Sequence, residues 1–429
     1  MFPQAPSSGL TQTTSYKVVL PFYIYGAISV IVATVLLFFS SSSFLQHYFH
    51  PEILAITHVM ALGWGTMMIL GASHQLVPVL IEGKLYSNAL AYFTFCCAAI
   101  GIPFLIYAFY TFNTGWPAQT GAILINVAVF FYLINIAVSM AKSKKENIHA
   151  IFVFTATMWL FITTLVGLFL IYNFTHNILT ADSISYPPLH AHLGIIGWFV
   201  LLVFGVGSRL IPLFLISKYN NLKLLWWIYG LVNFALIIFM VIFLFLHTSW
   251  LYFIPLGALF TSILLFAIFC RKAYQDRLRK KADDQIKVSL FSVLMMIIPV
   301  IFLLITIVLL ANSTEDPKLV LAYGFCIFFG WITAIIFGMT FKTLPFILWN
   351  KTYHNKAGIG KTPNPRELFD NKIFRVMTIF YLAGFLIFVA GILFSNNIIL
   401  KIAALLLLVA AILYNSNVLK MVFHKPKVV

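Results

Sequence analysis

Long apolar runs separated by short polar segments dominate the chain. Twelve of them are long enough to cross a hydrocarbon layer about 30 Å thick, because a helix rises about 1.5 Å per residue. The sequence therefore predicts an all-α integral membrane protein. Its spans should lie at about 19–41, 52–80, 88–112, 118–141, 148–173, 188–216, 222–246, 250–270, 287–311, 317–348, 372–394 and 397–422.

A four-residue frame recurs in the second, sixth and tenth predicted spans. It consists of Gly-Trp, a glycine seven residues after the tryptophan and a proline seven residues further on. The tryptophans are 134 and 133 residues apart, which indicates one module used three times. We predict a single membrane domain of three pseudo-symmetric four-helix repeats, at about 17–146, 147–285 and 286–429. The marker residues are Trp64, Gly71 and Pro78, then Trp198, Gly205 and Pro212, then Trp331, Gly338 and Pro345.

The composition agrees with this pattern and adds an orientation. Residues are 62% hydrophobic and 9% charged, with a mean hydropathy of +1.00. Of the 27 Lys and Arg residues, only Lys318 and Lys401 fall in the segments on the side away from both termini. The positive-inside rule then predicts a multi-pass protein of the bacterial plasma (inner) membrane, with both termini cytoplasmic. The basic loops are expected to contact anionic lipid, and nucleic acid is not an expected partner.

Histidines occur unevenly within the repeated frame. Six residues before the tryptophan stand His58, His192 and Phe325, and eight residues before it stand Ile56, His190 and Tyr323. A histidine inside an apolar helix is unfavourable unless it is hydrogen-bonded or ligated. Two interpretations remain open, a hydrogen-bonded polar cluster or a haem or metal site formed by His58, His190 and His192, and we favour the second.

The spacing of His190 and His192 restricts the kind of ligand. Two residues apart on a helix, their side chains point about 200° apart, so they do not readily chelate one ion together. One of them can face His58 while the other faces a different neighbour. This favours a ligand that bridges two helices, such as a haem held between His58 and one of the pair, over a compact ion site. His74 lies too far along the helix to join, and we expect His149 on the inner side to be solvated.

The acidic residues exclude some transport functions. All eleven can be placed in loops or at helix ends, whereas proton pumps and ion-coupled transporters usually place an acid within the bilayer. Arg209 and Lys342, which share one position of the frame, are expected to extend to the inner headgroups. The four cysteines lie in apolar runs and form neither a disulfide framework nor a metal motif.

The chain resembles the catalytic subunit of haem-copper oxidases and nitric oxide reductases. That subunit has twelve helices in three groups of four, and one motif helix carries His-x-His, twelve residues, glycine, six residues and proline. His190 and His192 with Gly205 and Pro212 match this spacing, and His58 with its glycine and proline matches it with one histidine. The resemblance implies haem b as cofactor, copper being less favoured, and either other respiratory membrane subunits or a periplasmic electron carrier as partners.

Two departures from that family restrict the expected chemistry. The family's His-x-His lies on helix 10, where this chain has Tyr323 and Phe325, and the copper-site histidines of helix 7 are absent from 222–246. We therefore expect a haem-b-binding membrane protein that transfers electrons or binds a small gas such as nitric oxide, without oxygen reduction of its own. The alternatives are a copper- or metal-handling protein of oxidase assembly and a structural subunit without cofactor.

Overall fold

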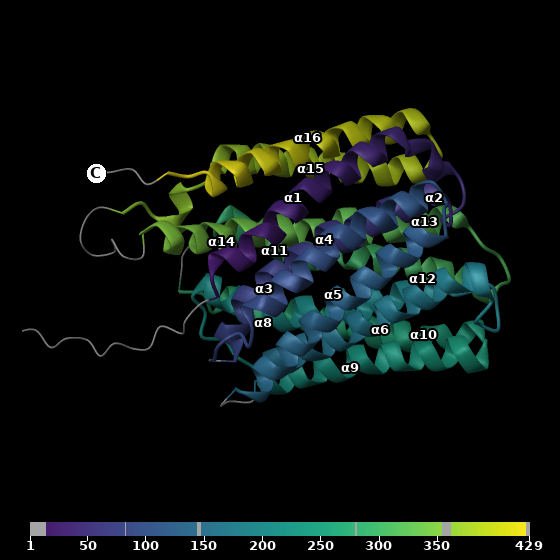
Figure 1. The fold of residues 1–429 in the computed structure, drawn as a ribbon, viewed down its shortest axis with the longest axis horizontal. Coiled ribbons are helices and arrows are strands. Elements are labelled where there is room, and N and C mark those ends of the chain that lie inside the picture. Colours follow the sequence, from purple (N-terminus) through teal and green to yellow (C-terminus); the bar gives the residue numbers. More distant parts are fainter. Residues whose placement is uncertain (1–13, 82, 144–146, 279–280, 354–361, 426–429) are drawn as a thin grey trace, which may run out of the picture.

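The computed structural model describes residues 14–81, 83–143, 147–278, 281–353 and 362–425. Twelve helical spans lie side by side along the long axis of the molecule, and each matches a predicted span to within a few residues (Figure 1). The all-α membrane fold is thus confirmed. Six spans are single helices: α1 (Tyr16–Phe39), α4 (Asn88–Tyr110), α5 (Trp116–Ala141), α6 (Ile148–His176), α15 (Asn371–Leu393) and α16 (Asn397–Val422).

The other six spans are composite. Three of them carry the repeated frame and are called here the motif helices. The first motif helix consists of α2 (Pro51–His58), η2 (Val59–Thr66) and α3 (Met67–Leu80), and the second of α7 (Pro187–His192), η4 (Leu193–Val200) and α8 (Leu201–Leu215). The third consists of α13 (Pro317–Phe325), η7 (Cys326–Ile332) and α14 (Thr333–Tyr353). The remaining three are α9 (Leu222–Val241) with η5 (Ile242–Leu246), η6 (Ser249–Tyr252) with α10 (Phe253–Gln275), and α11 (Asp284–Met295) with α12 (Ile297–Ala311). Short 3-10 turns lie outside these spans: η1 (Ser41–Leu45), η3 (Ser183–Ser185) and η9 (Pro365–Glu367).

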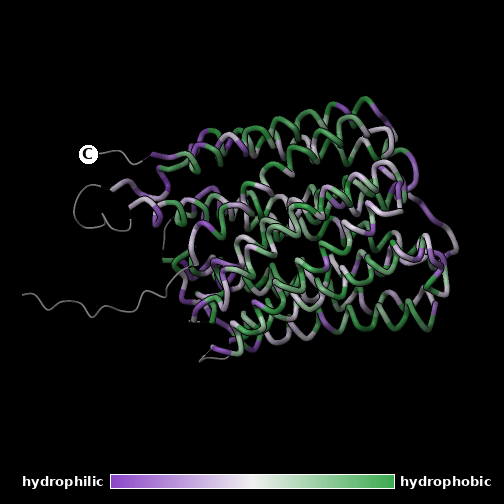
Figure 2. Tube along the Cα trace, viewed as in Figure 1, coloured by the Kyte–Doolittle hydropathy of each residue, from purple (hydrophilic) through white to green (hydrophobic). Residues whose placement is uncertain are grey.

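The motif helices form the centre of the bundle. Within their most apolar stretches, 67%, 78% and 78% of residues are buried, against 28–50% in the other nine spans. The outer helices expose large apolar side chains such as Trp227, Ile379 and Ile398 along their sides. Hydrophilic residues gather at the two ends of the bundle, and α1 begins at the same end as α16 finishes (Figure 2). This distribution fits a bundle whose sides contact lipid chains.

Each motif helix changes from α to π geometry at the same position of the frame. The π segments η2, η4 and η7 begin directly after His58, His192 and Phe325, and each contains the frame tryptophan. Short π segments inside helices are rare and are frequent at functional sites. A π turn contains about one residue more than an α turn, so the side chains that follow it are rotated about the helix axis. The frame tryptophan therefore points in a different direction, relative to the residue before the π segment, than it would in a continuous α-helix.

The frame tryptophans link the motif helices to one another. Trp198 donates its indole N–H to Thr66 on the first motif helix, and Trp64 donates to Thr333 on the third, both at 3.1 Å. Thr66 and Thr333 each stand two residues after a frame tryptophan. The equivalent residue on the second motif helix is Val200, which cannot accept, and Nε1 of buried Trp331 has no partner among the described residues. Three equivalent bonds would close a ring around the three motif helices, but only two of them are formed, because Trp331 lacks an acceptor in the described part of the chain.

The prolines have local consequences that the surrounding chain accommodates. Pro78 removes the hydrogen bond that would reach the carbonyl of His74, and Thr14 donates its hydroxyl to that oxygen at 2.6 Å. Pro299 lies four residues after Met295, where α11 ends, so the ninth span is broken there. Within the bilayer, such freed carbonyls need a partner from the protein.

The frame glycines bring the first helix of each predicted repeat close to its motif helix. A Cβ added at Gly71 would overlap Phe22 of α1, one at Gly205 would overlap Phe152 of α6, and one at Gly338 would overlap Ser289 of α11. The division of the chain into three repeats stays a prediction, but these contacts join equivalent elements of each proposed unit.

Charged residues behave mostly as expected, with one correction. Every described acidic residue lies in a loop or at a helix end; Glu82 and Glu146 lie outside the described residues. Arg209 is exposed, as predicted. Lys342, in contrast, does not extend freely to the headgroups, because its ammonium pairs with the carboxylate of Asp283 at the start of α11, which Arg366 also contacts. The four cysteines are free thiols, as predicted.

The incomplete tryptophan ring gives a stability prediction. Replacing Val200 by threonine supplies a hydroxyl at the position that accepts from the other two tryptophans. We expect the variant to be more stable by about 1 kcal/mol, because a buried indole N–H gains an acceptor. Thermal unfolding of the purified protein in detergent measures the effect.

The matched control is Val232→Thr, which adds the same hydroxyl to a fully buried position of α9. This control should leave stability unchanged or lower it. Conversely, Thr66→Val removes an acceptor and should destabilise by about 1–3 kcal/mol. Equal midpoints for Val200→Thr and Val232→Thr would contradict the role given to Val200.

Candidate functional site

Two of the three candidate histidines meet between the first and second motif helices. The rings of His58, at the end of α2, and His190, on α7, have centroids 6.3 Å apart and planes inclined by 19°. They lie 132 positions apart in the sequence and are brought together only by the packing of the two helices. The prediction that one member of the His190/His192 pair faces His58 is met by His190.

The separation of the two rings can be compared with that of two axial ligands. A metal–imidazole bond is about 2.0 Å long and the nitrogen lies about 1.2 Å from the ring centre, so two imidazoles on one metal have centres about 6 Å apart. The measured 6.3 Å agrees with this value. The separation is therefore compatible with one metal atom between a nitrogen of each ring.

Hydrogen bonding fixes the tautomer of His58. Its Nδ1 lies 2.8 Å from the carbonyl oxygen of Leu54, one turn earlier on α2. A carbonyl can only accept, so Nδ1 carries the proton and Nε2 keeps its lone pair. Metal-bound histidines in proteins usually hold their second nitrogen in this way. Phe109 of α4 packs on the other side of the ring, with centroids 4.4 Å apart.

His190 lies in a niche made by a glycine. Gly167 of α6 leaves the space that the ring fills, and a Cβ there would stand 2.8 Å from its Cε1 atom. The Nδ1 atom of His190 is buried and makes no hydrogen bond of standard geometry among the described residues, although the backbone carbonyl of Thr163 on α6 lies near the ring. An unpaired buried nitrogen of this kind is unfavourable by about 1–3 kcal/mol, so a buried histidine left in this state is a candidate ligand.

A third protein ligand is missing from this pair. Among the described residues, no group of three or more His, Cys, Asp or Glu side chains is placed to hold a metal ion. Of the histidines at the same end of the bundle, His47 packs on Tyr48 and His176 bonds to Thr175. A metal held by this pair would therefore have two protein ligands, and its other ligands would have to come from a cofactor such as a porphyrin.

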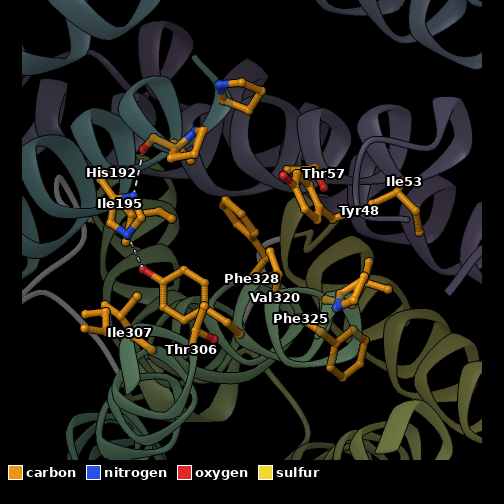
Figure 3. A pocket seen from close by; sticks show the side chains of 18 of the residues that line it. Tyr48, Ile53, Thr57, His192, Ile195, Thr306, Ile307, Val320, Phe325 and Phe328 are labelled. Carbon is orange, nitrogen blue, oxygen red and sulfur yellow. Dashed lines mark hydrogen bonds between the residues drawn. The ribbon is translucent and has the colours of Figure 1, made fainter. Parts of the chain in front are cut away.

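His192 turns away from His58 and forms a second polar pair. Its Nδ1 bonds to the carbonyl of Pro188 at 2.7 Å, and its Nε2 lies 3.2 Å from the hydroxyl of Tyr323 on the third motif helix (dashed in Figure 3). Phe239 of α9 packs against the ring. Since this pair is directly hydrogen-bonded, no metal fits between them in this arrangement. His192 is therefore the candidate that the structure separates from the other two.

On the third motif helix, aromatic packing replaces the histidine. Phe325 occupies the frame position of His58 and His192, and its ring stacks with those of Phe329, Phe385 and Phe388 at centroid distances of 4.8, 6.0 and 4.3 Å. No polar atom is presented there. The asymmetry seen in the sequence is thus retained in the packing.

A cavity of about 430 Å³ lies beside His192, among the three motif helices, α9, α10 and α12 (Figure 3). Most of its lining is apolar. Sequence reasoning identified His192 and Tyr323 but had no signal for the cavity, because the lining residues come from helices that are far apart in the sequence. Tyr48 borders the cavity at its outer end, and burial together with the Glu315 carboxylate raises the pKa of this phenol.

Two histidines at the other end of the bundle differ from expectation. His149 was expected to be solvated, but it is 6% exposed and its Nδ1 lies 2.8 Å from the hydroxyl of Ser208. The reason is that α6 begins beneath the second motif helix, which covers its first turn. His74 is fully buried against Phe22 and Tyr132 and remains apart from the His58–His190 pair, as predicted.

Comparison with known proteins shows a fold likeness. No family model matches the sequence, and no curated protein matches it. Among solved structures, a chain of a haem-copper terminal oxidase dimer, determined by cryo-electron microscopy, superposes with a TM-score of 0.68 and 10% sequence identity. The match covers 97% of this chain and 85% of that chain. The predicted resemblance to the oxidase membrane subunit is thereby confirmed for the fold.

The niche at Gly167 generates a prediction. Gly167→Val should displace the His190 ring and lower stability by about 1–3 kcal/mol, since the added methyl groups overlap a well-packed side chain. Gly230→Val on α9 is the matched control, because a Cβ there meets nothing within 4 Å. Thermal unfolding compares the two variants. Equal stability would show that His190 does not occupy the niche tightly.

Proposed function

We propose that the protein is a haem-b-binding membrane protein that transfers electrons, with the haem held between His58 and His190. The observation that carries the proposal is the spacing of these two rings, 6.3 Å between centroids and 19° between planes. The free lone pair on Nε2 of His58, and the lack of a hydrogen bond of standard geometry at Nδ1 of His190, support it. The fold likeness to a haem-copper terminal oxidase supports a haem protein without identifying the haem.

The residues around the pair favour a cofactor that carries its own equatorial ligands. His58 and His190 would supply the two axial nitrogens, and Leu54 would hold His58 in the ligating tautomer through its carbonyl. Haem b supplies a reversible one-electron couple when bound. An iron with two protein nitrogens has no vacant position, which suits electron transfer and disfavours gas binding.

The setting of the site suggests where the electrons go. Both histidines lie near the start of their motif helices, which the distribution of Lys and Arg places at the outer face of the membrane. In a bacterial inner membrane with both termini cytoplasmic, that face is periplasmic. We therefore propose a periplasmic electron carrier, or another respiratory membrane subunit exposed on that side, as the redox partner.

Oxygen reduction by this chain alone is not part of the proposal. The family that the fold resembles uses a haem with an open position facing copper, and the copper histidines have no counterparts on α9. Phe325 fills the third motif position with stacked aromatic rings. Every described carboxylate lies in a loop or at a helix end, so none is placed to lead protons through the middle of a span.

Copper handling is the second candidate, and the same spacing favours it. Two imidazoles about 6 Å apart also suit a linear two-coordinate copper(I), and a buried apolar site with nitrogen ligands is compatible with that ion. The absence of a third ligand among the described residues disfavours copper(II) and zinc, which prefer four ligands. Metal identity therefore separates the two proposals.

The first prediction concerns the ligands. Purified wild-type protein should contain about one haem b per chain with a low-spin spectrum. His58→Ala and His190→Ala should each reduce bound haem at least about tenfold or convert it to high-spin, because one axial ligand is lost. His192→Ala is the matched control and should keep the low-spin spectrum. Absorption spectra and a pyridine haemochrome assay provide the measurement.

Three outcomes would contradict this assignment in different ways. About one copper and no iron per chain, lost in His58→Ala, would support the copper-handling alternative. A spectrum that depends on His192 but not on His190 would mean that the ligand pair has been misassigned. Neither metal in protein isolated from its native membrane would favour a structural subunit.

The second prediction is functional. Protein supplied with ascorbate and a redox mediator should reduce its haem but consume no oxygen above the rate of a buffer control. Oxygen electrode measurements test this. Sustained consumption that cyanide inhibits would contradict it, because cyanide requires an open coordination position.

A further inference from the structure

The cavity beside His192 is a second site that the His58–His190 pair does not use. We propose that it binds an uncharged, membrane-soluble ring compound that carries a carbonyl or hydroxyl oxygen, the chemical class of the isoprenoid quinones. The His192–Tyr323 pair is its hydrogen-bonding anchor. The inference concerns binding only and is independent of the haem proposal.

The anchor can bond to both forms of such an oxygen. Because Nδ1 of His192 donates to the Pro188 carbonyl, Nε2 must accept, and the hydroxyl of Tyr323 donates to it. The oxygen of Tyr323 keeps lone pairs that can accept from a ligand hydroxyl. If the phenol rotates its O–H toward the ligand, it donates to a carbonyl instead. One pair of side chains thus recognises a quinone-type oxygen in either oxidation state.

The size and lining of the cavity suit a ring compound. Its volume of about 430 Å³ is within the range of about 300–1,000 Å³ usual for small-molecule sites. The lining combines many apolar and aromatic side chains with few polar ones, among them Ile195, Ile307 and Phe328 around His192 (Figure 3). A planar apolar ring would be enclosed on several sides and oriented by one polar anchor.

The charges at the cavity exclude anionic lipids. No lysine or arginine is among the lining residues, whereas Glu315 and Asp316 border its outer end. A fatty acid or a phospholipid headgroup would bring a negative charge toward two carboxylates without a cation to receive it. An uncharged ligand meets no such opposition.

Access from the bilayer is available beside α12. This helix lies at the edge of the bundle, and only Pro299 and Ile307 of its residues are buried. Leu303, Thr306 and Leu310 border the cavity and are partly exposed, while Ile305 on the same helix is 40% exposed. One helix thus separates the cavity from lipid, and an apolar tail can extend past it.

Equilibrium binding of a labelled menaquinone with a two-unit prenyl tail tests the proposal. The full-length protein is placed in nanodiscs, and empty nanodiscs give the partition background. We expect saturation near one molecule per chain above that background. Tyr323→Phe should weaken binding about tenfold, because one hydrogen bond to a buried ligand is lost. Ile307→Trp, which fills the cavity, should abolish saturable binding.

Tyr48→Phe provides the matched control, since it removes a phenolic hydroxyl from the same cavity at a distance from the anchor. It should bind within about twofold of wild type. Oleate in excess should not compete. The titration is repeated on His58→Ala, so that failure of the haem proposal leaves this result unaffected.

Three results would overturn the inference. Binding no greater than in empty nanodiscs would show simple partitioning into lipid. Equal affinity in wild type, Tyr323→Phe and Ile307→Trp would place the ligand elsewhere. A second haem per chain that disappears in His192→Ala would make the cavity a haem site.

Discussion

A lipid bilayer offers no hydrogen bonds, and this constraint governs the whole molecule. Every polar group within the spans must find its partner inside the protein or in a bound ligand. Most do so locally, as when Thr14 bonds to the carbonyl that Pro78 frees on His74. The exceptions are few among the described residues, and His190 Nδ1 is one of them. Trp331 Nε1 is another, so such an atom does not by itself identify a ligand site, and the proposal for His190 depends on the facing ring of His58.

The three motif helices show how one scaffold supports different chemistry. All three begin their π segment after the same frame position, which carries His58, His192 or Phe325. The first histidine meets His190, the second meets Tyr323, and the phenylalanine enters an aromatic stack. The backbone positions three equivalent side chains, and the chemistry depends on which residue the neighbouring helix presents. The outer half of the bundle can therefore hold a two-ligand centre and a separate cavity.

Low sequence identity and a shared fold are compatible under the same constraint. Helix length, apolar surface and close packing at glycine positions limit how twelve spans can be arranged, while few individual side chains are required. At 10% identity the chain keeps the oxidase fold, yet it lacks the histidines that the oxidase family uses on helices 7 and 10. Activity therefore has to be argued from His58, His190 and their surroundings, because the fold is common to different sites.

The sequence alone determined the twelve spans, their central motif helices and three candidate histidines, because apolar length and a repeated frame are local properties of the chain. It also determined that His190 and His192 point in different directions, since helix geometry requires it. Which of them faces His58 was decided only by tertiary structure, through the niche at Gly167 and the contact with Tyr323. Burial of His149 and the cavity beside His192 were likewise inaccessible to sequence reasoning. Both are formed by residues from separate helices, and their positions depend on the relative tilt and rotation of those helices.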